Sequence, residues 1–261
     1  MIEAVAAKDI LRTGLSRLGL QLVDQDTALA RLVGYFQELR KWNRKVNLVA
    51  REAGDQEILE KHFLDSLTLL PWLGQGIAAQ PASLLDIGTG AGFPGLVLKI
   101  ACPDLAVTLV EPREKRVFFL RQVARLLGIS AGLEILPVRL EPRAATSVLA
   151  GRTFRVVTSR AFSELRAFLE LAAPYCAPQG RVICMKGPRA PEELAAWQAA
   201  AGDSPLKFIE QREWCLPFSG GTRILLVFGD RSAAGGSKRG GCSEMVNVHQ
   251  CRRCAKEACE L

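Results

Sequence analysis

The sequence has few of the residues on which proton-transfer catalysis usually depends. Its 261 residues include two His and two Tyr. His is the side chain that most often moves protons near neutral pH. No Ser-His-Asp triad and no Tyr-Lys pair is evident in the sequence, so we name no catalytic proton-transfer residue.

Long apolar runs are also missing. No stretch approaches the roughly 20 apolar residues that cross a bilayer. Residues 1–10 contain two acids and one Lys, which differs from the basic and then apolar start of a secretion signal. We therefore expect a cytoplasmic protein without a membrane partner.

Cysteine is more frequent, with eight residues, but it forms no disulfide framework. Four lie in apolar stretches, where Cys usually acts as a small buried hydrophobe: Cys102, Cys176, Cys184 and Cys215. The others lie in the last twenty residues beside His249: Cys242, Cys251, Cys254 and Cys259. Their spacing matches no standard zinc finger and a Gly-rich linker precedes them, so an extension of little function is favoured and no metal is expected.

The composition indicates one globular domain with a smaller appendage. Hydrophobic residues make up 49% of the chain, and the formal net charge is +7. Such a positive surplus suits either a well-solvated surface or a polyanionic partner. Charge alone does not decide between these two readings.

The hydrophobic pattern predicts an α/β fold. Residues 8–73 show helical spacing and form an N-terminal helical layer. Beyond residue 82, strands alternate with helices, which predicts a mainly parallel, doubly wound, seven-stranded sheet with helices on both faces and a terminal antiparallel hairpin. The predicted strands are 83–87, 107–110, 133–138, 155–158, 181–185, 207–215 and 224–228, and the helices 94–101, 114–127, 164–173 and 191–201. We place domain boundaries at 1–80, 81–230 and 231–261.

A glycine-rich loop follows the first predicted strand. Residues 84–92 read LLDIGTGAG, and small residues there let the backbone turn sharply beside a ligand. Residues 90–95 also satisfy the G-x-G-x-x-G dinucleotide pattern, with Glu111 at a plausible distance to bind a ribose. An NAD-dependent reductase is therefore one reading of this loop.

Two features favour S-adenosylmethionine over NAD. Asp86 would repel a pyrophosphate but suits a cationic sulfonium or amino group, and Gly88 with Gly90 extends the pattern to D-x-G-x-G-x-G. Glu111 ends the second strand, where a carboxylate can accept hydrogen bonds from both ribose hydroxyls. Leu140 and Glu141 follow the third strand, where they can hold an adenine.

Several segments together resemble the RsmG family, also called GidB. They are DIGTGAGFPGLVL at 86–98, KRVFFL at 115–120, TSRAF at 158–162 and MKG at 185–187, and residues 42–43, 47–48 and 62–67 are similar too. The resemblance covers residues 29–228. It implies a Rossmann-like class I methyltransferase that uses S-adenosylmethionine to methylate ring nitrogen seven of one guanine, position 527 in the 530 loop of 16S ribosomal RNA.

The resemblance also implies cofactor contacts at Gly88, Phe93, Leu140, Glu141 and Arg160, to which the residue-level reading adds Asp86, Gly90 and Glu111. Arg160 and Lys186 are the candidates for contact with RNA. The expected partner is 16S rRNA or the small ribosomal subunit, and the expected state is a monomer. A basic RNA-binding module with a vestigial cofactor fold remains as a non-enzymatic alternative.

Two further positions stay open at this level. His62 and Asp65, spaced i and i+3 on one helix face, are more typical of a packing device than of a functional pair. Trp42 could stack on an RNA base, but an aromatic on an amphipathic helix more often belongs to the core.

Overall fold

The computed structural model describes residues 2–73, 83–141, 149, 151–160, 164–200 and 204–230. Seven strands form one sheet in the order β3-β2-β1-β4-β5-β7-β6. Strands β1 to β5 pair in parallel, whereas β7 is antiparallel to both β5 and β6. This confirms the predicted sheet and hairpin. The strands are β1 (Ser83–Ile87), β2 (Ala106–Val110), β3 (Leu133–Leu136), β4 (Phe154–Ser159), β5 (Cys176–Lys186), β6 (Leu206–Cys215) and β7 (Thr222–Asp230).

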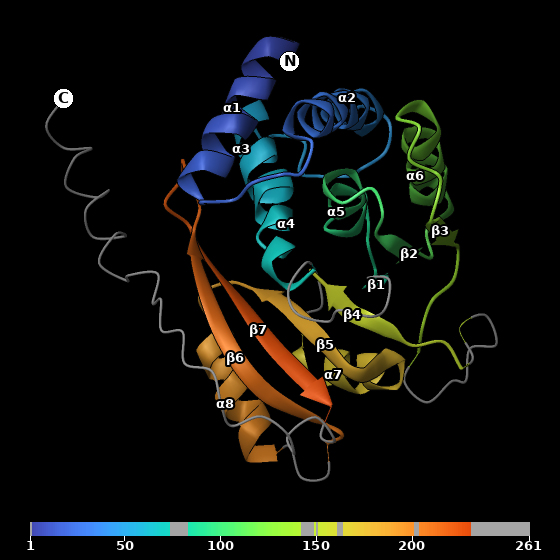
Figure 1. Cartoon of the computed structure of the whole chain (residues 1–261), viewed down its shortest axis with the longest axis vertical. Coiled ribbons are helices and arrows are strands. Elements are labelled where there is room, and N and C mark those ends of the chain that lie inside the picture. The colour runs from blue at the N-terminus through green and yellow to red at the C-terminus, as the bar shows by residue number, and fades with distance from the viewer. Residues whose placement is uncertain are drawn as a thin grey trace, which may run out of the picture.

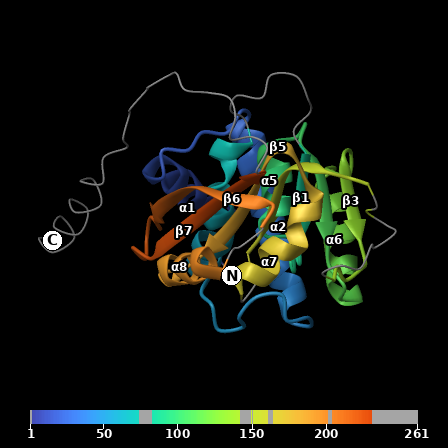
Figure 2. The ribbon, with the colours of Figure 1, turned by 90° about the horizontal axis from the view of Figure 1, so that it is seen from below.

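The helices cover both faces of this sheet (Figures 1 and 2). Helices α1 to α6 lie on one face, with α6 beside β3 at the sheet edge, and α7 and α8 lie on the other. They are α1 (Ala4–Arg17), α2 (Gln25–Asn43), α3 (Asp55–Ile58), a π-helical segment (Leu59–Leu64), α4 (Asp65–Leu67), a 3-10 turn (Leu70–Trp72), α5 (Gly95–Ala101), α6 (Glu114–Leu126), α7 (Leu165–Ala172), a second 3-10 turn (Ala173–Tyr175) and α8 (Ala190–Ala200). No helix of the described ranges is long and apolar enough to cross a membrane.

Strand β1 has its predicted bounds, and each of the other six strands differs from them by at least one residue at an end. The differences in β3 and β5 have a clear physical reason. Strand β3 ends at Leu136, because Pro137 has no backbone N–H for a further ladder bond. Strand β5 begins at Cys176, five residues earlier than predicted, and its pairing with β4 is irregular there. Pro178 and Gly180 hide this early part of the strand from a pattern-based prediction, since both residues are typical of turns.

Each face of the sheet has its own apolar core. In β1, Leu84 packs into the core shared with α1 to α6, and its neighbour Leu85 packs into the core formed with α7 and α8. This alternation follows from the two-residue period of a strand. The N-terminal helices therefore share a core with the sheet, and the boundary proposed at residue 80 stays a prediction, as does the tail at 231–261, which lies outside the described residues.

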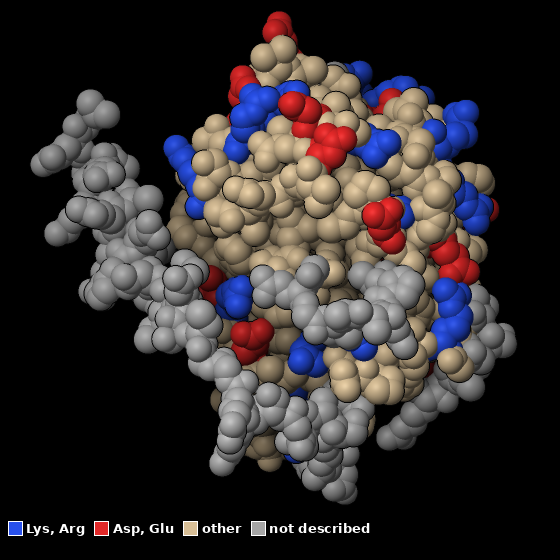
Figure 3. All heavy atoms as spheres, viewed as in Figure 1, with Lys and Arg blue, Asp and Glu red and all other residues tan. Residues whose placement is uncertain are grey.

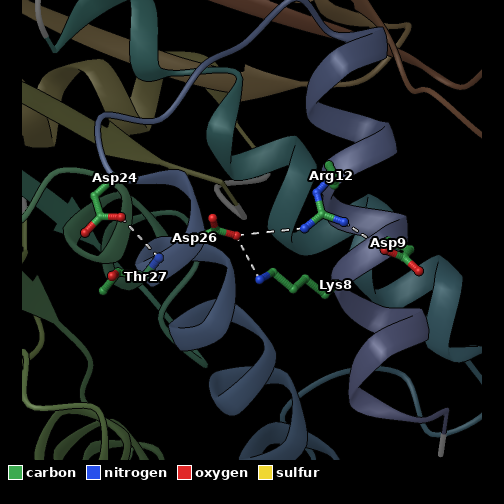
Figure 4. Close-up of polar contacts among 6 residues, drawn as sticks. All are labelled: Lys8, Asp9, Arg12, Asp24, Asp26 and Thr27. Atoms are coloured by element: carbon green, nitrogen blue, oxygen red, sulfur yellow. Dashed lines mark hydrogen bonds and ion pairs between the residues drawn. The ribbon is translucent and has the colours of Figure 1, made fainter.

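The first two helices pack by apolar contact rather than by their surface charges. Lys8 Nζ lies 2.9 Å from Asp26 Oδ1, and Arg12 also lies near this carboxylate (Figure 4). The hydrogen bond from Lys8 lowers the pKa of Asp26. Exposed pairs of this kind contribute little to stability, whereas Leu11 and Leu29 are fully buried in the shared core.

Glu60 joins the N-terminal helices to the turn between β6 and β7. Its side chain is 2% exposed, and Oε1 accepts hydrogen bonds from the backbone N–H groups of Phe218 at 2.5 Å and Ser219 at 2.9 Å. Arg17 reaches the same turn, donating to the carbonyl of Pro217 at 2.7 Å. The hydrogen bonds of Glu60 therefore hold the hairpin against the helical layer, although the two segments lie about 160 residues apart in the sequence.

We expect Glu60→Ala to lower the free energy of unfolding by about 2–4 kcal/mol, because it leaves two backbone donors without their charged acceptor. Glu60→Gln keeps one acceptor oxygen and should cost about 1 kcal/mol. The matched control is Glu57→Ala, which removes an exposed partner of Lys61 and should change stability by less than about 0.5 kcal/mol. Urea denaturation measures all three, and equal losses in Glu60→Ala and Glu57→Ala would contradict this role.

Candidate functional site

The glycine-rich loop connects β1 to α5 at the carboxyl edge of the parallel strands. Gly88, Gly90 and Gly92 have φ angles of 72°, 63° and 101°, which favour glycine. At Gly92 a Cβ would also lie 2.6 Å from the hydroxyl of Tyr35. At Gly88 it would meet nothing within 4 Å, so the loop is closely packed at Gly92 and open at Gly88.

Asp86 lies at the end of β1 and is fully buried. Its Oδ2 accepts hydrogen bonds from Thr89 Oγ1 at 2.6 Å and from the backbone N–H of Gly95 at 2.8 Å, so it ties the two ends of the loop together. Burial raises the pKa of Asp86 to about 6, against the opposing effect of these two donors. Its Oδ1 is buried and has no hydrogen-bond partner within the described residues.

Glu111 lies just after β2 and faces the same loop. Its Oε2 accepts a hydrogen bond from the backbone N–H of Gly90 at 3.0 Å, and Oε1 accepts one from that of Arg113 at 2.8 Å. Arg116 Nη1 lies 3.6 Å from Oε2. With 2% exposure, Glu111 is an inward-facing acceptor rather than a surface carboxylate.

Phe93 connects the loop to the N-terminal helices. Its ring stacks with the rings of Tyr35, at a centroid distance of 5.4 Å, and His62, at 5.1 Å. The guanidinium of Arg160 lies 5.0 Å from the same ring centroid, and Arg160 Nη1 donates to the carbonyl of Lys61 at 3.1 Å. Tyr35 in turn donates a hydrogen bond to the carbonyl of Ala91. These contacts fix the loop against helix α2 and the π-helical segment.

A cavity of about 290 Å³ opens beside this stack, where β4, β5 and β7 meet the π-helical segment. It contains four cationic side chains and one carboxylate. Its lining residues are Lys61, His62, Asp65, Arg160, Met185, Lys186, Gly187 and Arg223.

The charges in this cavity are only partly balanced. Arg223 Nε lies 3.3 Å from Asp65 Oδ1, and Lys186 Nζ lies 2.7 Å from Glu193 Oε2 on α8. Burial raises the pKa of Asp65, with Arg223 and Arg160 acting against it. Burial, followed by the charge of Arg160, lowers the pKa of His62 to about 3, so this imidazole is neutral at physiological pH.

Comparison with known proteins places this site in a family. The family model described as GidB, rRNA small subunit methyltransferase G, matches residues 28–207. A protein named ribosomal RNA small subunit methyltransferase G from Desulfotalea psychrophila is 44% identical, over 83% of this chain and 95% of its own length. One of the same name from Myxococcus xanthus is 43% identical, over 85% and 96%.

The chain belongs to the rRNA small subunit methyltransferase G family. Its sheet has the class I methyltransferase topology, and membership implies S-adenosylmethionine as the methyl donor. A solved structure of a SAM-dependent methyltransferase from Aquifex aeolicus is also similar, with a TM-score of 0.47 and 19% identity over 66% of this chain and 91% of that one.

The structure brings most of the predicted site residues of this methyltransferase together. Asp86, Gly90 and Glu111 are linked by contacts within the loop, and Phe93 contacts Arg160. Leu140 is buried in the core on the α7 side, and Glu141 is exposed at the end of its segment. Residues 161–163 of the TSRAF segment and the Cys-rich tail lie outside the described residues.

The structure also adds residues that sequence reasoning did not assign to the methyltransferase site. His62 and Asp65 line the cavity with Arg160, and the sequence signals for them were their i, i+3 spacing and the family-like segment 62–67. Arg223 had no signal, since it reaches the cavity from the terminal hairpin. Lys99 on α5 is 3% exposed and donates to the carbonyls of Pro103 and Leu105, so its role is structural.

Potential metal ligands do not cluster within the residues that the structure describes. In the ranges that the structure describes, no group of three or more His, Cys, Asp or Glu side chains is arranged to hold a metal ion. Residues 242–259, which contain the tail cysteines, are outside those ranges.

We expect the stability that depends on Asp86 to fall as pH rises. Because its folded-state pKa is about 6 and its unfolded value about 3.8, the folded state holds the proton more tightly between these pH values. The free energy of unfolding should therefore decrease, relative to Asp86→Asn, by about 2 kcal/mol between pH 4 and pH 6.5.

Denaturation of both proteins across this pH range, without cofactor, measures the difference. Asp26→Asn is the matched control, because the lowered pKa of exposed Asp26 predicts a small change of opposite sign, with its stabilising contribution lost as pH falls. A difference that stays flat with pH would mean that Thr89 and Gly95 keep Asp86 ionised in the folded state.

Proposed function

We propose that this methyltransferase transfers the methyl group of S-adenosylmethionine to ring nitrogen seven of guanine 527 in the 530 loop of 16S ribosomal RNA. The observation that carries this proposal is the position of Arg160. Its guanidinium contacts Phe93 of the cofactor loop and also lines the cationic cavity. A single side chain therefore adjoins both the candidate donor site and the candidate acceptor site.

The residues of the loop fit S-adenosylmethionine. The buried Oδ1 of Asp86 lacks a partner among the described residues, and the loop is open at Gly88. Above about pH 6 Asp86 carries a negative charge, which favours a cationic ligand and repels a pyrophosphate. When bound, this cofactor supplies an electrophilic methyl group on a positively charged sulfur.

Each remaining residue has a defined place in this proposal. Glu111 accepts hydrogen bonds from ribose hydroxyls, for which each of its carboxylate oxygens retains acceptor capacity. Gly88 and Gly90 allow close approach of the ligand, and Phe93 packs the loop against Tyr35 and His62. Leu140 and Glu141 hold the adenine from the segment after β3.

The cationic cavity suits a nucleotide of the substrate RNA. Binding pockets for small ligands begin at roughly 300 Å³, and a cavity of about 290 Å³ fits one flipped base. Arg160 and Arg223 provide the positive charge that attracts the phosphate backbone. Lys186 remains a candidate for RNA contact, although Glu193 balances much of its charge.

The chemistry needs positioning rather than proton transfer. Nitrogen seven of guanine has a free lone pair, so it would not have to lose a proton before accepting the electrophilic methyl group that bound S-adenosylmethionine would supply. His62 is neutral and stacked on Phe93, which suits a positioning role and not that of an acid. The rate enhancement then comes from orientation and electrostatics.

Hydride transfer has no comparable support. A reductase of the Tyr-Lys type needs a tyrosine close to a lysine, but Tyr35 is buried under the loop and donates to the carbonyl of Ala91. Burial also raises its pKa further. A ribosomal RNA substrate would locate the enzyme in the cytoplasm, and we expect it to act as a monomer.

The proposed reaction is tested with small ribosomal subunits, and with 16S rRNA, from a bacterial strain that lacks its own methyltransferase of this family. We expect one methyl group per RNA, located by chemical cleavage at 7-methylguanine. Calorimetric titration should show binding of S-adenosylmethionine and none of NADH. Methylation of another base, or binding of NADH alone, would overturn the proposal.

We expect Arg160→Ala to lower kcat/KM for RNA by at least about 100-fold, because it removes the cation beside the loop and opens the contact with Phe93. Arg160→Lys keeps the charge but not the planar group and should recover only part of the activity. Arg166→Ala is the control, since Arg166 is exposed on α7 and pairs with Glu170. Thermal unfolding checks that each variant folds, and near-normal turnover in Arg160→Ala would refute its assignment.

A further inference from the structure

A second cavity, which the proposed reaction does not use, lies between the end of α2 and the exposed face of α6. It has a volume of about 390 Å³, and we call it the α2/α6 groove. Its lining residues are Trp42, Val46, Lys115, Phe118, Arg121, Gln122 and Arg125. Five of these belong to α6, where residues 115, 118, 122 and 125 follow the i, i+3, i+7 spacing of one helix face.

The groove presents an aromatic surface that is not buried in the hydrophobic core. Trp42 packs on one side against Phe119, at a centroid distance of 5.7 Å, and lines the groove with its remaining surface. Phe118 is 55% exposed, one of few large apolar side chains of the described residues with so much contact with solvent. Exposed aromatic rings of this kind are typical stacking partners for unpaired bases.

The charge of the groove has one sign. Lys115, Arg121 and Arg125 are exposed, and no acidic residue lines the groove. Neither Lys115 nor Arg121 forms an ion pair with a carboxylate in the part of the chain that the structure describes. Figure 3 shows Lys and Arg side chains along the edge of the molecule at which Figure 1 places α6.

The groove adjoins the proposed cofactor site. Lys115 and Arg116 are consecutive residues in the first turn of α6. Lys115 lines the groove, whereas Arg116 Nη1 lies 3.6 Å from Glu111 and Arg116 Nη2 is 3.4 Å from the carbonyl of Asn47. A ligand in the groove would therefore be bound by the same helix that starts beside the cofactor loop.

Charge decides between the candidate occupants. The C-terminal segment 231–261 contains more Lys and Arg than Glu, so it would be repelled. A second copy in a two-fold symmetric contact would place this cationic groove against an identical cationic groove. A polyanion that carries planar rings satisfies both the cations and the aromatic side chains, and RNA is such a molecule.

We propose that the α2/α6 groove binds a second segment of the substrate RNA, outside the nucleotide that is methylated. An unpaired base stacks on Phe118, and the adjoining phosphates contact Lys115, Arg121 and Arg125. This inference rests on the proposed function, because it assigns a further part of the same RNA to the enzyme.

The test compares groove variants in steady-state methylation of whichever RNA substrate, naked or in the subunit, the unaltered full-length enzyme methylates. We expect Phe118→Ala to raise KM for RNA about tenfold, because it removes one stacking contact. The double variant Lys115→Ala/Arg121→Ala should raise it by a similar factor. In both, kcat at saturating RNA and KM for S-adenosylmethionine should remain within about twofold.

Salt dependence separates stacking from charge. The slope of log KM against log salt should fall by about 1.4 in the double variant, since each phosphate contact on a single strand contributes about 0.7. It should not change in Phe118→Ala. Leu126→Ala is the matched control, because Leu126 is 53% exposed on the same helix but does not line the groove.

Each failure has a distinct signature. If the unaltered enzyme methylates RNA and the groove variants keep its KM, the groove inference is wrong and the proposed function stands. If the unaltered enzyme methylates no ribosomal RNA, the proposed function fails and the inference fails with it. A shift from dimer to monomer in Phe118→Ala by sedimentation would instead assign the groove to self-association and overturn the inference.

Discussion

The stack around Phe93 is the contact on which the rest of the site depends. Tyr35 from α2 and His62 from the π-helical segment both stack with its ring, and the guanidinium of Arg160, just after β4, lies 5.0 Å from the ring centroid. The N-terminal helices are thus joined to the cofactor loop and to the cavity by one side chain. Because a Cβ at Gly92 would lie 2.6 Å from the Tyr35 hydroxyl, this close approach of the loop to α2 requires glycine at that position.

Burying a charged group at such a junction costs desolvation free energy, and the structure buries ionisable groups there at a few positions. Asp86 is held away from water by the loop it organises, and its raised pKa reports that cost. In the neighbouring cavity, Asp65 and Arg223 form an ion pair, so each partly offsets the desolvation free energy of the other. Buried ionisable groups with perturbed pKa values concentrate at functional sites, where they provide a fixed electrostatic field for a ligand.

Local patterns in the sequence account for the fold and for the loop, but not for the cavity. Strands β1 and β2 read as apolar runs because both their faces are buried, and the glycines mark the turn through backbone angles that other residues avoid. The position of Glu111 could also be predicted from the sequence, since the carboxyl ends of neighbouring parallel strands share an edge. Arg223 meets Asp65 only through the packing of the hairpin against the helices, which no local spacing encodes.

A reaction without proton transfer changes what the protein must provide. The chain does not need a tuned acid or base near the target nitrogen, but it must hold a flexible RNA so that one lone pair faces one methyl carbon. Contacts far from the reacting atoms can supply the binding energy for unstacking and orienting that base. Two separate cationic surfaces, one around Arg160 and one along α6, therefore suit this chemistry better than a single deep pocket would, because two anchors fix an orientation that one leaves free.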